Sequence, residues 1–88
     1  MKNVAVLAGN RNQFNGWAVD QRTVQNCHEW KLAPNNGWLE IGETIYRHIA
    51  RETSLRGVRW DSFLRVGTWY NVGDQLADLF EQYEKMPR

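Results

Sequence analysis

The chain has 88 residues, of which 42% are hydrophobic and 24% are charged, and its net charge is +1. This length predicts a single domain spanning residues 1–88. The nearly balanced charge argues against bulk electrostatic binding to nucleic acid or to an anionic membrane. No apolar stretch reaches the roughly 20 residues that cross a bilayer, and the apolar run near the start is too short for a signal peptide. A single cysteine, Cys27, excludes an internal disulfide, so we expect a cytoplasmic protein.

The first predicted element is a strand at residues 4–8. Its sequence, VAVLA, is continuously apolar, which is typical of a strand covered on both faces in a parallel sheet. The asparagines at positions 10 and 12 are suited to cap a helix, and apolar residues then follow at helical spacing. Gly16 weakens this helix, so we expect it to be short.

The middle of the chain predicts a hairpin. Residues 29–33 alternate as a strand does, Pro34–Gly37 form a strong turn signal, and residues 38–41 return as the partner strand. Residues 44–49 are rich in β-branched and aromatic side chains and predict a further strand. Residues 54–60 predict a helical turn and a loop.

Two more elements complete the predicted fold. Residues 62–66 predict a second buried strand, and residues 73–86 predict an amphipathic helix because apolar side chains recur every three or four positions. The order of elements indicates an α/β class, a small Rossmann-like sandwich. We expect a short, mostly parallel sheet, a Trp-rich hairpin insertion at residues 21–43 and a C-terminal amphipathic helix.

Five tryptophans are the unusual feature of the composition. Each large aromatic buries on the order of 150–250 Å², so we expect most of them in the core or in a subunit interface. A chain this short buries only roughly 60–65% of its unfolded surface, and a homo-oligomer would add stability. The tryptophans are Trp17, Trp30, Trp38, Trp60 and Trp69.

The turn after the first strand has features of an anion site. Gly9 allows a ligand to approach the backbone, the following helix presents free N–H groups, and Arg11 offers a charge-assisted contact. The pattern is neither a Walker A loop nor a complete G-x-G-x-x-G motif. A plain polar connection is the alternative interpretation.

A second wall of the same site is predicted after residues 62–66. If the two buried strands are neighbours, Thr68 supplies a hydroxyl, and Trp69 and Tyr70 supply flat faces beside the first turn. The alternative is a pair of aromatic side chains that closes the end of the core.

Five arginines lie between positions 47 and 65, and solvated surface is the expected place for most of them. Arg56 is the exception, because flexible backbone at Gly57 can bring it into a cleft.

Enzymatic signals are weak. Cys27 and His28 are adjacent, so they point in opposite directions in a strand and make a poor nucleophile–base pair. One cysteine and two histidines do not form a zinc site, and structural roles are expected for His28 and His48. Glu43 is the best catalytic carboxylate, with no partner to pair with it. No catalytic residue, metal or cofactor is therefore predicted.

Three short segments carry a resemblance. The sequence AGNRNQF at 8–14, LRG at 55–57 and VGTWY at 66–70 resembles a group of small uncharacterised bacteriophage and bacterial proteins with an AGN-x-x-QF start, a central LRG and a VGTWY end. The resemblance covers the ends of the core and the central loop, but not residues 21–43. It implies a Rossmann-like frame and a phage-type origin, and it implies no activity.

We therefore expect a non-catalytic module that binds a nucleotide or another phosphate-bearing small molecule at the carboxyl ends of its strands. In a phage context, in the host cytoplasm, such a module would counteract host defence by sequestering a nucleotide signal. The alternative is a protein–protein interaction module that modulates a host protein through Trp30 and Trp38. The predicted ligand-binding residues are Gly9, Asn10, Arg11, Gln13, Arg56, Gly67, Thr68, Trp69 and Tyr70.

Overall fold

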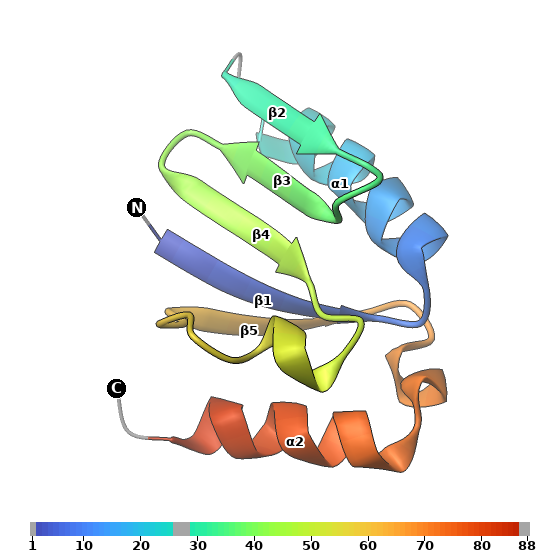
Figure 1. The fold of residues 1–88 in the computed structure, drawn as a ribbon. Coiled ribbons are helices and arrows are strands. Elements are labelled where there is room, and N and C mark those ends of the chain that lie inside the picture. The colour runs from blue at the N-terminus through green and yellow to red at the C-terminus, as the bar shows by residue number, and fades with distance from the viewer. Residues whose placement is uncertain (1, 26–28, 87–88) are drawn as a thin grey trace.

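One mixed sheet and two helices form the protein in a computed structural model, which describes residues 2–25 and 29–86 (Figure 1). The strands are β1 (Lys2–Ala8), β2 (Trp30–Ala33), β3 (Trp38–Ile41), β4 (Thr44–His48) and β5 (Ser62–Val66). The helices are α1 (Arg11–Gln25) and α2 (Asp74–Lys85), with short 3₁₀ helices at Glu52–Ser54 and Trp69–Val72. The chain is thus an α/β protein, as its sequence predicts. No described helix is both long enough and apolar enough to cross a membrane.

The strand order is β2-β3-β4-β1-β5, and the sheet is mixed. β1 is parallel to both of its neighbours, β4 and β5, whereas β2–β3 and β3–β4 are antiparallel pairs. The expectation of a mostly parallel sheet therefore holds only around β1. The cause is the two-residue connection Gly42–Glu43 between β3 and β4, because a connection this short can join only antiparallel strands. The predicted hairpin is not a separate insertion, since its strands continue the same sheet.

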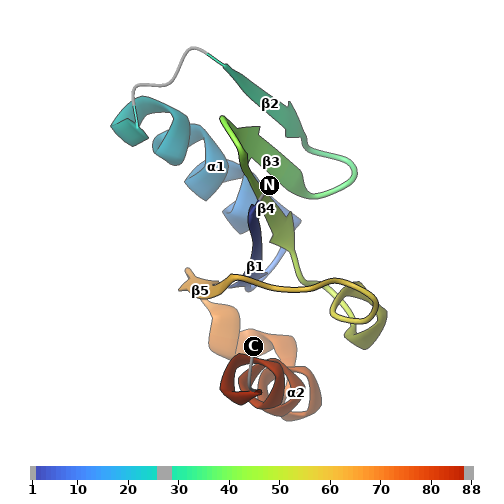
Figure 2. The ribbon, with the colours of Figure 1, turned by 90° about the vertical axis from the view of Figure 1, so that its left-hand side faces the viewer.

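The sheet has a helix on each face, but the two helices cover different parts of it. Figure 2 shows α1 beside β2, β3 and β4, and α2 below β5. β1 lies at the centre and is buried from Val4 to Ala8, which explains its continuously apolar sequence. The cluster under α1 contains Val4, Val6, Ala8, Phe14, Ala18, Leu39 and Ile41. The cluster under α2 contains Ala5, Leu7, Ile49, Leu55, Trp60 and Phe80.

Part of the sheet face opposite α1 has no α-helix over it. Among the described residues, the cluster under α2 draws no member from β2, β3 or β4. Trp38 of β3 pairs with Arg47 of β4, and Arg47 in turn is level with Ala5 of β1, whose side chain lies on the α2 side. Trp38 and Arg47 therefore share this face, and both are half-buried.

α1 is longer than its sequence predicts, with 15 residues. Gly16 was expected to shorten it, but Gly16 is exposed and a Cβ there would meet nothing within 4 Å. Tertiary packing of Phe14 and Ala18, both fully buried, stabilises the helix despite the unfavourable propensity of one glycine.

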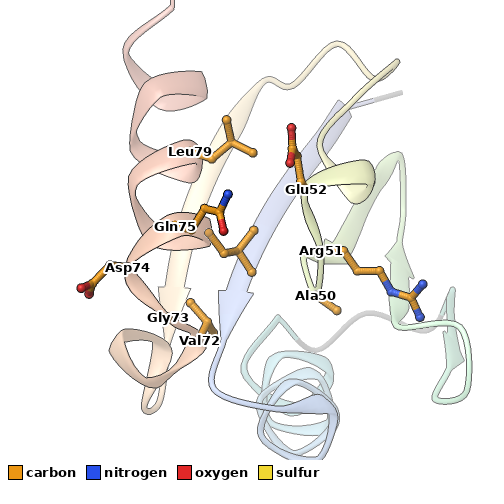
Figure 3. Close-up of a pocket in the computed structure, with 9 residues that line it drawn as sticks. Ala50, Arg51, Glu52, Val72, Gly73, Asp74, Gln75 and Leu79 are labelled. Carbon is orange, nitrogen blue, oxygen red and sulfur yellow. The ribbon is translucent and has the colours of Figure 1, made fainter.

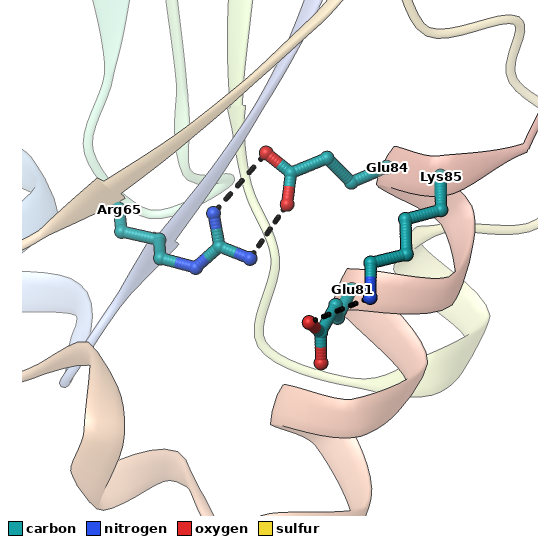
Figure 4. A network of polar contacts seen from close by, with 4 residues as sticks. All are labelled: Arg65, Glu81, Glu84 and Lys85. Carbon is teal, nitrogen blue, oxygen red and sulfur yellow. Dashed lines mark hydrogen bonds and ion pairs between the residues drawn. The ribbon is translucent and has the colours of Figure 1, made fainter.

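α2 confirms the amphipathic helix predicted at residues 73–86. Both aromatic packing and an ion pair hold α2 against β5. Phe80 is buried and stacks edge-on against Phe63. The guanidinium of Arg65 donates to both carboxylate oxygens of Glu84, at 2.7 and 3.2 Å (Figure 4). A basic strand thus pairs with the acidic C-terminal helix. Such a bidentate geometry orients α2 more than it stabilises it, because both side chains are partly solvated.

Candidate functional site

The first turn and the VGTWY segment meet at one edge of the sheet. Ala8 and Val66 are partners at the ends of the parallel strands β1 and β5, so the segments that follow them are neighbours, as predicted. Gln13, in the first turn of α1, joins the two segments. Its Oε1 accepts hydrogen bonds from the backbone N–H of Gly9 at 3.2 Å and of Thr68 at 2.9 Å, and its Nε2 donates to Thr68 Oγ1 at 2.7 Å.

Two glycines are required by the close packing around Gln13. A Cβ on Gly9 would lie 2.2 Å from Thr68 Oγ1, and a Cβ on Gly67 would lie 2.4 Å from Gln13 Oε1. Gly67 also has a φ of +59°, a left-handed conformation that favours glycine. The Gln13 cluster (Gly9, Gln13, Gly67 and Thr68) therefore fills the space between the two segments. Its polar groups are bonded to each other, and of its residues only Gly9 lines the neighbouring cleft.

That cleft lies at the carboxyl ends of β1 and β4 and is here called the strand-end cleft. Its volume is about 390 Å³, and it is bordered by the start of α1 and by the second 3₁₀ helix. Of the predicted residues, Gly9, Asn10 and Arg11 line it. The full lining is Ala8, Gly9, Asn10, Arg11, His48, Ile49, Ala50, Asn71 and Val72.

Arg11 is held in place by three hydrogen bonds. Its Nε donates to Nδ1 of His48 at 2.8 Å, and one terminal nitrogen donates to the carbonyl oxygens of Asn35 at 2.8 Å and Pro34 at 3.4 Å. The guanidinium lies against Gly37, where a Cβ would be 2.6 Å from its carbon. Arg11 thus connects α1 to the β2–β3 turn, and its positive charge stays at the rim of the cleft.

His48 ends β4 and is buried, with 8% of its surface exposed. Burial lowers the pKa of His48 below its ordinary value of 6.5, and the charge of Arg11 lowers it further, while a hydrogen bond to the backbone of Ala8 opposes both effects. The imidazole is therefore neutral at pH 7, with Nδ1 as an acceptor. Its ring also stacks on Phe14, 5.3 Å away between centroids.

The start of α1 presents unused donors to the cleft. The side chain of Asn10 accepts a hydrogen bond from the N–H of Gln13 at 2.9 Å, and its carbonyl accepts from Phe14, which is the geometry of an N-cap. Within the described chain, the N–H groups of Arg11 and Asn12 have no hydrogen-bond acceptor. Such groups carry the positive end of the helix dipole and attract anions.

A neighbouring groove continues from the strand-end cleft and shares Ala50 and Val72 with it. Figure 3 shows this groove between the loop after β4 and the start of α2, with Gln75 and Glu52 inside it and Asp74 pointing away. Glu52 pairs with Arg56. The lining of this groove includes Arg51 but also the carboxylates of Glu52 and Asp74, so it is less suited to an anion than the strand-end cleft.

The other predicted ligand-binding residues lie apart from the strand-end cleft lining. Arg56 is exposed and paired with Glu52 one helical turn earlier. Trp69 packs against the cluster under α2, and the guanidinium of Arg65 lies 5.4 Å from its ring centroid. Tyr70 is 62% exposed and immediately precedes Asn71, which lines the cleft.

The two tryptophans of the predicted interaction surface lie on opposite faces of the sheet. Trp30 is level with Ile41, a member of the cluster under α1, and Arg22 of α1 lies 4.4 Å from its ring centroid. Trp38 is on the uncovered face beside Arg47. The sheet therefore separates them.

Sequence reasoning missed His48 and Asn71 as lining residues. His48 ends a strand parallel to β1, and the rule that ligands bind beyond the carboxyl ends of parallel strands was a signal that could have found it. Asn71 had no such signal, because the second 3₁₀ helix brings it to the cleft. Cys27 and His28, which the sequence indicates to be a poor nucleophile–base pair, lie outside the described residues. Within residues 2–25 and 29–86, no group of three metal-ligating side chains is placed to hold an ion.

Comparison with known proteins finds no matching family model, no matching curated protein and no matching solved structure. A functional conclusion for this chain therefore depends on the geometry of its own residues.

Proposed function

We propose that the strand-end cleft binds a phosphate-bearing small molecule, such as a nucleotide, without transforming it. One observation carries the proposal. The cleft combines the unpaired N–H group of Arg11, at the start of α1, with the fixed guanidinium of the same residue, and its described lining includes no Asp or Glu. Helix N–H donors beside a cation, with no opposing carboxylate, are the usual surroundings of a bound phosphate.

The state of His48 favours binding over catalysis. One ring nitrogen accepts from Arg11, and the imidazole also hydrogen-bonds to the backbone of Ala8. Nδ1 is therefore occupied by Arg11, and the described lining offers no carboxylate beside the imidazole. In this proposal, His48 positions Arg11 for binding.

The surroundings of the cleft suit the rest of a nucleotide. Tyr70 is exposed and adjacent in sequence to Asn71 of the lining, so its ring offers a face for stacking by a base. Asn71 offers both a donor and an acceptor to a ribose or base. The resemblance of the sequence motifs to phage proteins extends the proposal to a host nucleotide signal that the protein would sequester.

A titration of the full chain with a panel of nucleotides and with inorganic phosphate tests the proposal. We expect saturable binding by calorimetry and a higher melting temperature, since a ligand that binds only the folded state stabilises it. Asn71→Asp places a carboxylate in the cleft at an exposed position and should weaken binding about tenfold, equivalent to ~1.4 kcal/mol.

Gln82→Glu is the matched control, because it adds the same charge at an exposed position of α2 and should leave binding unchanged. Two results would overturn the proposal. One is the absence of saturable binding for every nucleotide and for phosphate. The other is equal affinity of the wild type and Asn71→Asp.

A further inference from the structure

A second cavity lies on the sheet face that α2 leaves uncovered, and it is here called the β4 pocket. It has a volume of about 180 Å³ and is lined by Asn36, Gly37, Trp38, Arg47, His48 and Ser54. Trp38 and Arg47 face each other directly across the β3–β4 pair. The β4 pocket shares only His48 with the described lining of the strand-end cleft.

Arg47 lines this pocket and has an unpaired guanidinium donor. Its Nε is a buried atom without a hydrogen-bond partner, and within residues 2–25 and 29–86 its guanidinium forms no ion pair. Most buried donors in folded proteins are satisfied, and an unsatisfied one attached to a charge is costly. Arg47 thus brings to the pocket a guanidinium whose charge has no ionic partner in the described chain, and such a group favours an anionic ligand.

Two other side chains of the pocket, those of Ser54 and Asn36, are able to donate hydrogen bonds. Ser54 ends the first 3₁₀ helix and is half-buried, and its hydroxyl has no hydrogen-bond partner in the described part of the chain. Asn36 brings a side-chain amide from the β2–β3 turn. The described lining contains no Asp or Glu, so nothing on this wall neutralises Arg47.

We propose that the β4 pocket is an oxyanion site, which takes the phosphate or carboxylate group of a small molecule. Arg47 is the ionic partner, and its guanidinium supplies charge-assisted hydrogen bonds to the anion. Ser54 donates one neutral hydrogen bond, and the Trp38 ring forms an apolar wall against the rest of the molecule. The proposal is independent of the function assigned to the strand-end cleft, because other residues carry it.

Nitrogen-15 NMR of the full chain tests the β4 pocket with inorganic phosphate and, separately, with acetate, both at constant ionic strength. The Nε–Hε resonance of Arg47 reports on the pocket directly. We expect it to shift with saturation as phosphate or acetate is added, together with the indole resonance of Trp38. Saturation by phosphate alone assigns a phosphate ligand, and saturation by acetate assigns a carboxylate.

Two pairs of variants separate a site from general charge effects. Arg47→Met should abolish the saturable shift at Trp38, whereas Arg59→Met, which removes an exposed arginine, should not. Ser54→Asp should weaken binding about tenfold by placing a carboxylate beside Arg47, whereas Thr53→Asp at the exposed neighbouring position should leave it unchanged. If Arg47→Met fails to fold, the Ser54 and Thr53 pair decides the question.

Shifts that rise linearly with both anions would overturn the proposal, and so would equal binding by Ser54→Asp and Thr53→Asp. Failure at the two cavities can be distinguished, because Asn71→Asp alters only the strand-end cleft and Ser54→Asp alters only the β4 pocket.

Discussion

Gln13 binds Thr68 through both atoms of its side-chain amide, although the two residues are 55 positions apart in sequence. Oε1 accepts from the Thr68 backbone, and Nε2 donates to the Thr68 hydroxyl. The same Oε1 accepts from Gly9. One side chain therefore satisfies the backbone of both turns that follow the parallel strands β1 and β5, and it sets the position of α1 relative to the second 3₁₀ helix.

Replacing Gln13 tests this role. Gln13→Ala leaves the N–H groups of Gly9 and Thr68 without their acceptor in a partly buried place, and each unsatisfied group costs about 1–3 kcal/mol. We expect the free energy of unfolding to fall by roughly 2–4 kcal/mol in urea denaturation, less than the sum because water reaches part of the site. Gln82→Ala, at an exposed position of α2, is the control and should change stability little. Equal stability of the two variants would contradict a structural role for Gln13.

Replacing Gly9, which precedes α1, and Gly16, which lies within α1, by alanine should change the stability of the protein in opposite directions. Gly9→Ala places a methyl group 2.2 Å from Thr68 Oγ1 and 2.8 Å from the Thr68 carbonyl oxygen, so the backbone must shift, and we expect a loss of about 1–3 kcal/mol. Gly16→Ala meets nothing within 4 Å and removes a glycine from a helix, which should stabilise the protein by about 0.5–1 kcal/mol. Thermal and urea unfolding of both variants measures the signs. Neutrality of Gly9→Ala would disprove the packing described around the Gln13 cluster, and destabilisation by Gly16→Ala would disprove the open surroundings described for Gly16.

Some elements of this fold can be predicted because their local sequence carries a clear signal, and others cannot because it does not. The strand at residues 4–8 was predictable because burial on both faces leaves a continuous apolar signal in VAVLA. The strand at residues 62–66 forms as predicted, but its predicted burial is wrong, because β5 lies at the edge of the sheet and none of its residues is buried. The C-terminal helix was predictable from its apolar spacing. The mixed direction of the sheet was missed because the two-residue link Gly42–Glu43, whose glycine has a φ of +59°, was not recognised as an antiparallel turn.

The sequence predicts which segments form the candidate site, but not which of their polar groups are free to bind a ligand. The rule for the ends of parallel strands correctly brought together the turns after β1 and β5. Which polar groups remain free for a ligand depends on tertiary contacts that local sequence does not encode. Gln13 and Thr68 are bonded to each other, whereas the buried Nε of Arg47 is left without a partner. Arg47 was expected on a solvated surface, since its pairing with Trp38 on an uncovered sheet face depends on the register of β3 and β4.

The stability of the protein should depend on pH through His48. Burial and then Arg11 lower the pKa of the folded imidazole below 6.5, so at pH values between the folded and unfolded pKa the unfolded chain binds more protons. The contribution of His48 to the free energy of unfolding is therefore complete above pH 6.5. It decreases as the pH falls below 6.5, and it decreases no further once the pH is below the pKa of His48 in the folded protein. Protonation of Nδ1 also removes the acceptor for Arg11 Nε.

Urea unfolding of the wild type and His48→Asn at several pH values between 7.5 and 5 measures this pH dependence. His28 is present in both proteins and so cancels in the comparison. The gap in stability between wild type and variant should shrink as the pH falls, and a gap that stays constant would show that His48 has an unperturbed pKa in the folded protein.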